Sequence, residues 1–103
     1  MDLLIYDRLV LLSILPKDGN LVTMRVVRTL NERLGFTEEE IAKHNIKEHE
    51  NGNVTWDEGE PKPIEIGAKA REIIVNALNE LDTQKKVEPK HLPLFDKFDI
   101  GVD

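Results

Sequence analysis

Residues 64 to 81 combine a short apolar alternation with the clearest helical pattern of the chain. Ile64 and Ile66 alternate with polar neighbours, and after Gly67 the apolar residues recur at the spacing of one helix face. This face consists of Ala70, Ile73, Ile74, Ala77, Leu78 and Leu81. We therefore expect a strand over 64–66 and a helix from about Ala68 to Asp82, whose apolar face needs a partner surface.

The N-terminal segment has the apolar density that this partner surface requires. Residues 3–14 predict a helix with Asp2 as N-cap, and Pro16 stops it because the proline ring disfavours helical geometry at the preceding residue. The apolar run is too short to span a membrane and lacks the basic start of a signal peptide, so we expect a buried helix. Only Asp7, Arg8 and Ser13 remain for a narrow solvent-facing edge.

A second amphipathic helix is expected from Leu21 to Leu34, with Asn20 as N-cap and Gly35 directly after its end. Its apolar positions are Val22, Val26, Val27, Leu30 and Leu34. Its outer face carries Arg25, Arg28, Glu32 and Arg33. This pattern is typical of a solvated face with an Arg28–Glu32 pair, and the alternative interpretation is a stripe that binds acidic groups or phosphates.

The start of a third, short helix is the most specific local signal. Thr37 as N-cap and Glu40 three residues later form a capping box, and Phe36 with Ile41 forms a hydrophobic staple. The helix is expected to end near residue 44. A helix-turn-helix DNA reader does not fit, because Glu38, Glu39 and Glu40 would face the phosphates of the groove.

A hairpin is expected next, centred on Asn51 and Gly52. A two-residue loop would divide the apolar side chains between two faces, whereas a three-residue loop over 50–52 collects them on one face: Ile46, Val54 and Trp56. We choose the three-residue loop, with a left-handed Gly52, His49 opposite Asn53, and the tryptophan packing inward. The strand over 64–66 is expected to join this hairpin as a third member.

The C-terminal tail contains Pro89 and Pro93, which preclude one long helix. Pro93 suits the first position of a short helix that reaches Phe98. Leu92, Phe95 and Phe98 are expected to dock on the core, and the tail over 98–103 is expected to fray.

Composition limits the class of protein. A chain of 103 residues with 40% hydrophobic content is a single domain, residues 1–103, with one modest core. The chain has no cysteine, which excludes disulfides and thiolate metal sites and is compatible with a reducing, cytoplasmic location. No nucleophile motif, phosphate-binding loop or zinc spacing occurs, so we expect a protein that is not an enzyme and uses no cofactor.

The candidate metal ligands and acid–base pair are weak. His44, His49 and His91 match no ligand signature, so no metal site is expected. Asp57 and Glu58 are neighbouring carboxylates on a loop where nothing in the sequence predicts a shifted pKa, and we expect no acid–base role.

Charge is the most informative global property. The net charge is −6, and residues 37–66 alone hold three Lys/Arg and nine Asp/Glu. Such a surface repels phosphate backbones and favours a basic partner. The candidate partner-binding residues are Glu38, Glu39, Glu48, Glu50, Asp57, Glu58 and Glu60.

Residues 14–20, the run Leu-Gly-Phe-Thr-Glu-Glu-Glu-Ile at 34–41, and Ile-Glu-Ile-Gly at 64–67 form a turn, a capping box and a strand-to-helix junction. With these motifs the chain resembles small uncharacterised proteins encoded by bacteriophages and prophages. The resemblance implies an intracellular protein that acts on viral or host machinery, and it implies no particular activity.

These observations predict an α+β domain of winged-helix outline, with about four main helices and a small antiparallel sheet. The leading hypothesis is a non-enzymatic protein-binding module whose acidic surface meets a basic protein, as a viral inhibitor of a nucleic-acid enzyme would. The alternative is nucleic-acid binding through Arg25, Arg28 and Arg33. No membrane partner is expected, and the sequence leaves self-association open.

Overall fold

The computed structural model describes residues 1–100. It confirms the α+β class, with helices and two small antiparallel sheets. The helices are α1 (Ile5–Ile14), α2 (Leu21–Leu34), α3 (Glu38–Lys43), α4 (Ala68–Thr83) and α5 (Leu92–Lys97), with a 3-10 turn η1 (Pro89–His91). The strands are β1 (Asp2–Leu3), β2 (Lys47–Glu48), β3 (Val54–Thr55) and β4 (Lys62–Pro63). Among residues 1–100, no helix is long and apolar enough to cross a membrane.

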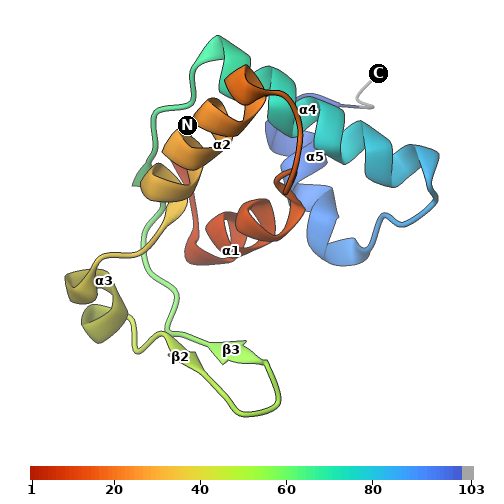
Figure 1. The fold of residues 1–103 in the computed structure, drawn as a ribbon. Helices are drawn as coiled ribbons and strands as arrows, with labels where there is room; N and C mark the ends of the chain where they lie inside the picture. The colour runs from red at the N-terminus through yellow and green to blue at the C-terminus, as the bar shows by residue number, and fades with distance from the viewer. Residues whose placement is uncertain (101–103) are drawn as a thin grey trace.

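The core forms where α1, α2 and α4 meet, and α5 packs against α1 (Figure 1). Each helix contributes its apolar face, as the 3.6-residue spacing predicts. The most deeply buried side chains of this core are Leu3, Leu11, Leu30, Leu34, Ile74, Leu78, Leu94 and Phe98. We call residues 1–35 and 61–100, which contain this core, the helical body.

The start of α1 differs from the prediction. Asp2 is not an N-cap, because Asp2 and Leu3 form β1 and pair antiparallel with Pro63 and Lys62. The helix begins two residues later than expected, with Leu4 at the N-cap and the Asp7 carboxylate accepting a hydrogen bond of 3.0 Å from its backbone N–H. The expected polar edge is also wrong in part, since Asp7 and Arg8 are 2% and 1% exposed.

The predicted N-caps of α2 and α3 are confirmed. The Asn20 side chain accepts a hydrogen bond from the Thr23 N–H, and α2 ends at Leu34 as predicted. Val22, expected on the apolar face, is 60% exposed. The capping box of Thr37 and Glu40 is present at the start of α3.

The hairpin has the predicted register. Lys47 pairs with Thr55 and Glu48 with Val54, and the His49 N–H donates to the Asn53 carbonyl. Gly52 has a φ of 85°, the left-handed conformation that a three-residue loop requires.

The three-stranded sheet expected for a winged-helix outline does not form. The strand near residue 64 lies earlier, at β4, and it pairs with β1 rather than with the hairpin. The Ile64 N–H donates to the Met1 carbonyl, which extends this pairing by one residue. The reason is burial: Ile64 is 5% exposed and belongs to the helical core, so this segment follows the body and not the hairpin.

The C-terminal segment closes the body. The short helix is confirmed, but Leu92 is 54% exposed, and Leu94 takes the core position with Phe98. The fraying expected from residue 98 is not seen at Phe98, which is 2% exposed, or at Ile100, whose N–H donates to the Phe95 carbonyl. The rest of the predicted tail, 101–103, lies outside the described residues.

Candidate protein-binding surface

Residues 36–60 form a separate lobe that contains α3, β2 and β3. Figure 1 shows this lobe apart from the packed helices of the body. No residue in it is buried, so it has no apolar core of its own. It holds eight Asp/Glu and two Lys, and the remaining residues of the chain sum to zero formal charge. We call residues 36–60 the acidic arm.

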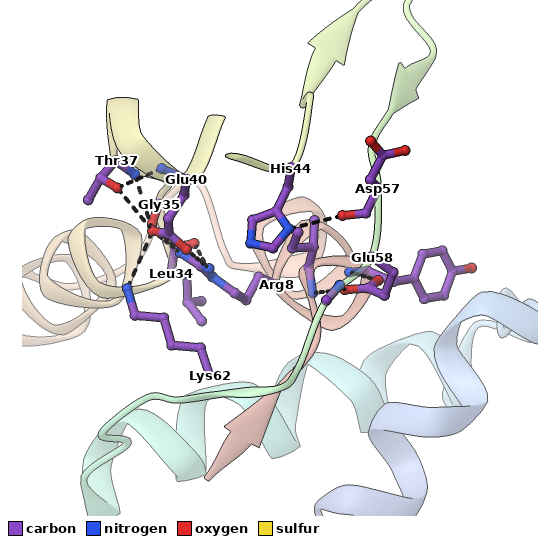
Figure 2. Close-up of polar contacts among 12 residues, drawn as sticks. Arg8, Leu34, Gly35, Thr37, Glu40, His44, Asp57, Glu58 and Lys62 are labelled. Carbon is purple, nitrogen blue, oxygen red and sulfur yellow. Dashed lines mark hydrogen bonds and ion pairs between the residues drawn. The ribbon is translucent and has the colours of Figure 1, made fainter. Parts of the chain in front are cut away.

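The first contact between arm and body, which we call the first anchor, is built around Arg8. The Arg8 Nε–H donates to the Leu34 carbonyl at 3.0 Å, and its two terminal nitrogens donate to the Gly35 carbonyl and to the Glu40 carboxylate (Figure 2). Its guanidinium carbon also lies 4.1 Å from the centre of the Phe36 ring. A buried arginine needs such partners, because an unpaired buried charge costs several kcal/mol. Arg8 therefore fixes the point where the arm leaves α2.

Glu40 receives contacts from three directions. Its side chain accepts from the Thr37 N–H at 3.2 Å, from Arg8, and from the Lys62 ammonium at 3.3 Å. The hydrogen bond from Arg8, aided by Thr37 and Lys62, outweighs desolvation and lowers the pKa of Glu40 to about 2. The carboxylate is thus ionised at any ordinary pH, and it joins α3 to both α1 and β4.

The second contact between arm and body, which we call the second anchor, is made by Glu58. Its carboxylate accepts hydrogen bonds from the backbone N–H of Ile5 at 3.0 Å and of Tyr6 at 3.4 Å, and from the Trp56 indole at 3.0 Å. Desolvation raises the pKa of Glu58, but these hydrogen bonds outweigh it and lower the pKa below its usual value. A carboxylate at the positive end of α1 is also favoured by the helix dipole.

An aromatic contact supports this second anchor. The Trp56 ring stacks on the Tyr6 ring with a centroid separation of 5.9 Å. Trp56 is half-buried, as are Ile46 and Val54, which share its face of the hairpin. The tryptophan therefore packs toward the body as predicted, but on the surface of α1 rather than inside the core.

The arm is also held together internally. The His44 Nδ1 lies 3.0 Å from the Asp57 carbonyl oxygen, and the Asn45 side chain donates to the Asp57 carboxylate at 2.7 Å (His44 and Asp57 in Figure 2). Gly59 packs so closely that a Cβ there would lie 2.6 Å from His44 Cε1. These contacts connect the end of α3 to the end of the hairpin, so the two parts of the arm are held together by hydrogen bonds and packing.

The seven predicted acidic residues divide into two groups. Asp57 and Glu58 have structural partners, as described above. The other five are free of ion pairs and side-chain hydrogen bonds within residues 1–100: Glu38, Glu39, Glu48, Glu50 and Glu60. All five are exposed. The predicted binding residues did not include Glu40. It is acidic and lies in the arm, but its carboxylate is occupied by Arg8, Thr37 and Lys62.

A groove of about 380 Å³ lies where the arm meets the body. Two of the free carboxylates, Glu39 and Glu60, line it together with Lys43, His44 and the Arg8–Glu40–Lys62 cluster. Its apolar lining comes from Leu3, Ile5, Pro61 and Pro63. The lining holds three carboxylates and three cations, so the groove is neutral as a whole, and its free carboxylates Glu39 and Glu60 are the groups that a basic side chain could meet.

The alternative site residues, three arginines of α2, line grooves of the body. Arg25 and Arg33 line a groove beside the first turn of α4, whereas Arg28 lines a different groove with Lys17. Arg33 donates to the Glu65 carbonyl at 3.2 Å. The expected Arg28–Glu32 pair is absent from the ion pairs of the described residues. The three arginines therefore line two different grooves.

The three histidines lie in unrelated environments. His44 and His49 are in the arm, where His49 Nε2 lies 2.7 Å from the Thr55 hydroxyl, and His91 is buried in the body. In the part of the chain that the structure describes, no three metal-binding side chains come together.

Arg8 is the important residue that sequence reasoning missed. A single arginine inside a nearly continuous apolar helix is a signal, because arginine is almost never fully buried without a partner. That signal predicts burial with an acidic partner but does not say which one.

No protein-family model, no curated protein and no solved structure matches this chain.

Proposed function

We propose that this chain is a non-enzymatic protein-binding module whose acidic arm binds a basic partner. The observation that carries the proposal is the placement of charge. The arm accounts for the whole net charge of −6, and five of its carboxylates have no partner within the described residues. Exposed carboxylates of one sign raise the association rate of a basic protein and set the orientation of the complex.

The way the arm is held supports a binding role rather than a solvated loop. Arg8, Glu40 and Glu58 fix both ends of the arm on α1, and His44 and Asp57 connect its parts. A surface held in shape before binding loses less conformational entropy when it binds. The free carboxylates are thus presented in a defined arrangement.

The partner that fits best is a protein that handles nucleic acid, since such proteins carry basic surfaces for phosphates. The acidic arm would occupy such a surface in place of nucleic acid. The resemblance to bacteriophage proteins supports a setting inside a bacterial cell, where the partner is viral or host machinery.

Affinity capture from a nuclease-treated bacterial lysate tests this proposal. The arm variant carries Glu48→Lys, Glu50→Lys and Glu60→Lys. The matched control carries Glu32→Lys, Glu65→Lys and Asp82→Lys, three exposed body residues whose side chains form no ion pair within residues 1–100. Both variants change the net charge from −6 to zero, so they separate position from total charge.

The expected result is a basic protein that the wild type and the body control retain at about 50 mM salt and that the arm variant does not. Retention should fall at about 500 mM salt, where the Debye length is only a few ångströms. Equal loss of the basic protein in both variants would show that binding depends on total charge and not on the arm, and would contradict the proposal.

Nucleic-acid binding through α2 is the alternative function. Arg25 and Arg28 are exposed and free of ion pairs within the described residues, which favours it. The test is the same capture without nuclease, using wild type and an Arg25→Glu, Arg28→Glu variant. Nucleic acid retained by the wild type and lost in this variant would move the function from the arm to α2.

A further inference from the structure

Another groove lies on the body, and none of its lining residues belongs to the arm. It has a volume of about 540 Å³ and is bordered by the end of α1, the last turns of α4, and η1. Ile14, Pro16, Ala77 and Leu81 give it an apolar lining. The groove is open to solvent, and its volume falls within the range of small-molecule sites.

His91 is the unusual residue of this groove. It is 4% exposed, and its Nδ1 accepts a hydrogen bond of 2.9 Å from the Glu88 backbone N–H. An imidazole nitrogen that accepts a hydrogen bond carries no proton, so the proton of the neutral ring is on Nε2. Desolvation lowers the pKa of His91, with help from Lys90, which favours this neutral form.

The Nε2–H of His91 has no partner within residues 1–100. No side-chain polar atom that is fully enclosed in this part of the chain lacks a hydrogen bond, so Nε2 is accessible from outside the protein, and the groove is a cavity that His91 lines. The ring is held by its Nδ1, and its accessible Nε2–H is free to donate to a ligand.

Most other polar groups of the groove are already engaged. The Ser13 hydroxyl donates to the Val10 carbonyl, the Glu80 carboxylate accepts from Gln84, and Glu88 pairs with Lys90 at 3.5 Å. The Lys86 ammonium has no ion pair among the described residues. The Glu80 carboxylate stays negative because its partner Gln84 is neutral, so the groove lining carries two carboxylates and two ammonium groups. The lining groups that lack a protein partner within residues 1–100 are the Lys86 ammonium and the His91 Nε2–H, beside an apolar lining.

We propose that this groove binds a small carboxylic acid with an apolar body, whose carboxylate accepts hydrogen bonds from His91 Nε2 and Lys86 Nζ while the body packs on Ile14, Ala77 and Leu81. The ligand needs both parts. Inorganic phosphate lacks the apolar body, and an alcohol of the same length lacks the charge that Lys86 attracts.

Titration of the full chain with hexanoate, followed by backbone amide NMR, tests this site. Hexanamide and inorganic phosphate are the comparison probes. We expect hexanoate to shift the amide signals around Leu81, Lys86 and His91 in a saturable way, and to bind at least tenfold more tightly than either comparison probe. Equal shifts by hexanoate and hexanamide, or shifts by phosphate alone, would overturn the proposal.

Two variants locate the ligand. Lys86→Gln removes the exposed cation and should weaken hexanoate binding about tenfold, as expected for loss of one charged hydrogen bond. His91→Asn keeps an oxygen that can accept from the Glu88 N–H, but its shorter side chain no longer places an N–H donor at the position of Nε2, and it should weaken binding similarly. Lys85→Gln, an exposed neighbour outside the lining, is the matched control and should bind as the wild type does.

Unchanged hexanoate affinity in Lys86→Gln would contradict the assignment even if His91→Asn failed to fold. This site does not involve the acidic arm, so its failure would leave the proposed protein-binding function unaffected.

Discussion

The helical body and the acidic arm obtain their structure in different ways. The body buries apolar faces of α1, α2, α4 and α5, and its central residues Leu11, Ile74 and Leu78 are fully enclosed. The arm buries no residue and depends on hydrogen bonds, caps and ion pairs with the body. Its surface is therefore left available for charge, and its shape is more sensitive to single polar substitutions than a comparable core element would be.

The largest effect is expected in the body. Leu78 is 0% exposed in the centre of α4, and Leu78→Ala should lower the free energy of unfolding by about 3 kcal/mol because it removes apolar contacts and leaves a cavity. Chemical denaturation followed by circular dichroism measures it. Leu92→Ala, at a site 54% exposed, should change stability by less than about 0.5 kcal/mol. Similar losses in the two variants would contradict the assignment of the core.

A smaller loss is expected at the first anchor of the arm. Glu40→Gln removes the charge that Arg8 and Lys62 face, and should cost about 2 kcal/mol at neutral pH. Because the folded-state pKa of Glu40 is about 2 against an ordinary 4.5, its stabilisation is complete above pH 4.5 and is lost as the pH falls toward 2. The stability difference between wild type and variant should shrink over that range, as denaturation at several pH values would show.

Lys62→Met is the control for the first anchor. The Lys62 side chain is 49% exposed, so its pair with Glu40 should contribute less than about 1 kcal/mol. A larger cost for Lys62→Met than for Glu40→Gln would place the anchor at β4 rather than at Arg8.

The second anchor should contribute less to stability than the first anchor at Glu40. Glu58→Gln removes the negative charge that caps α1 and should cost about 1 kcal/mol, within the range of helix capping. Trp56 reports on this anchor because its indole donates to Glu58 and its ring stacks on Tyr6, so its fluorescence should shift in the variant. Glu60→Gln, a neighbouring free carboxylate, should change neither stability nor fluorescence.

The smallest effect concerns the pH dependence of the body. The pKa of His91 is lowered in the folded state, mainly by desolvation, so the unfolded chain takes up a proton more readily. Stability should therefore decline as the pH falls through 6.5, and His91→Asn should remove this decline. Thermal unfolding between pH 7.5 and 5.5 measures it, and an identical slope in the two proteins would show that His91 does not control it.

The features predicted correctly from the sequence are those with a local cause. The capping box at Thr37 and Glu40 lies within four residues, and the register of the hairpin follows from the alternation around Gly52. The length of α4 follows from its apolar spacing. Each of these signals is complete within one element, so no knowledge of the tertiary structure is needed.

The features missed depend on residues far apart in the chain. β1 and β4 are separated by about 60 residues, and neither strand has a pattern of its own. Arg8 was assigned to solvent because its partners, Leu34, Gly35 and Glu40, become neighbours only when α1 packs on α2. For the same reason, the sequence identified the acidic stretch but could not tell that Asp57 and Glu58 have structural partners.

Native-state hydrogen exchange on the wild type and Glu40→Gln tests most directly whether the arm is a preformed surface held by polar anchors. The informative arm amides are Ile41, His44 and His49, which donate to backbone carbonyls within the arm. We predict measurable protection of these amides, with an opening free energy below that of the α4 amides. Glu40→Gln should lower the opening free energy of the arm amides further. The α4 amides should still exchange only through global unfolding. Absent protection in the wild type, or arm amides unaffected by Glu40→Gln, would contradict the account.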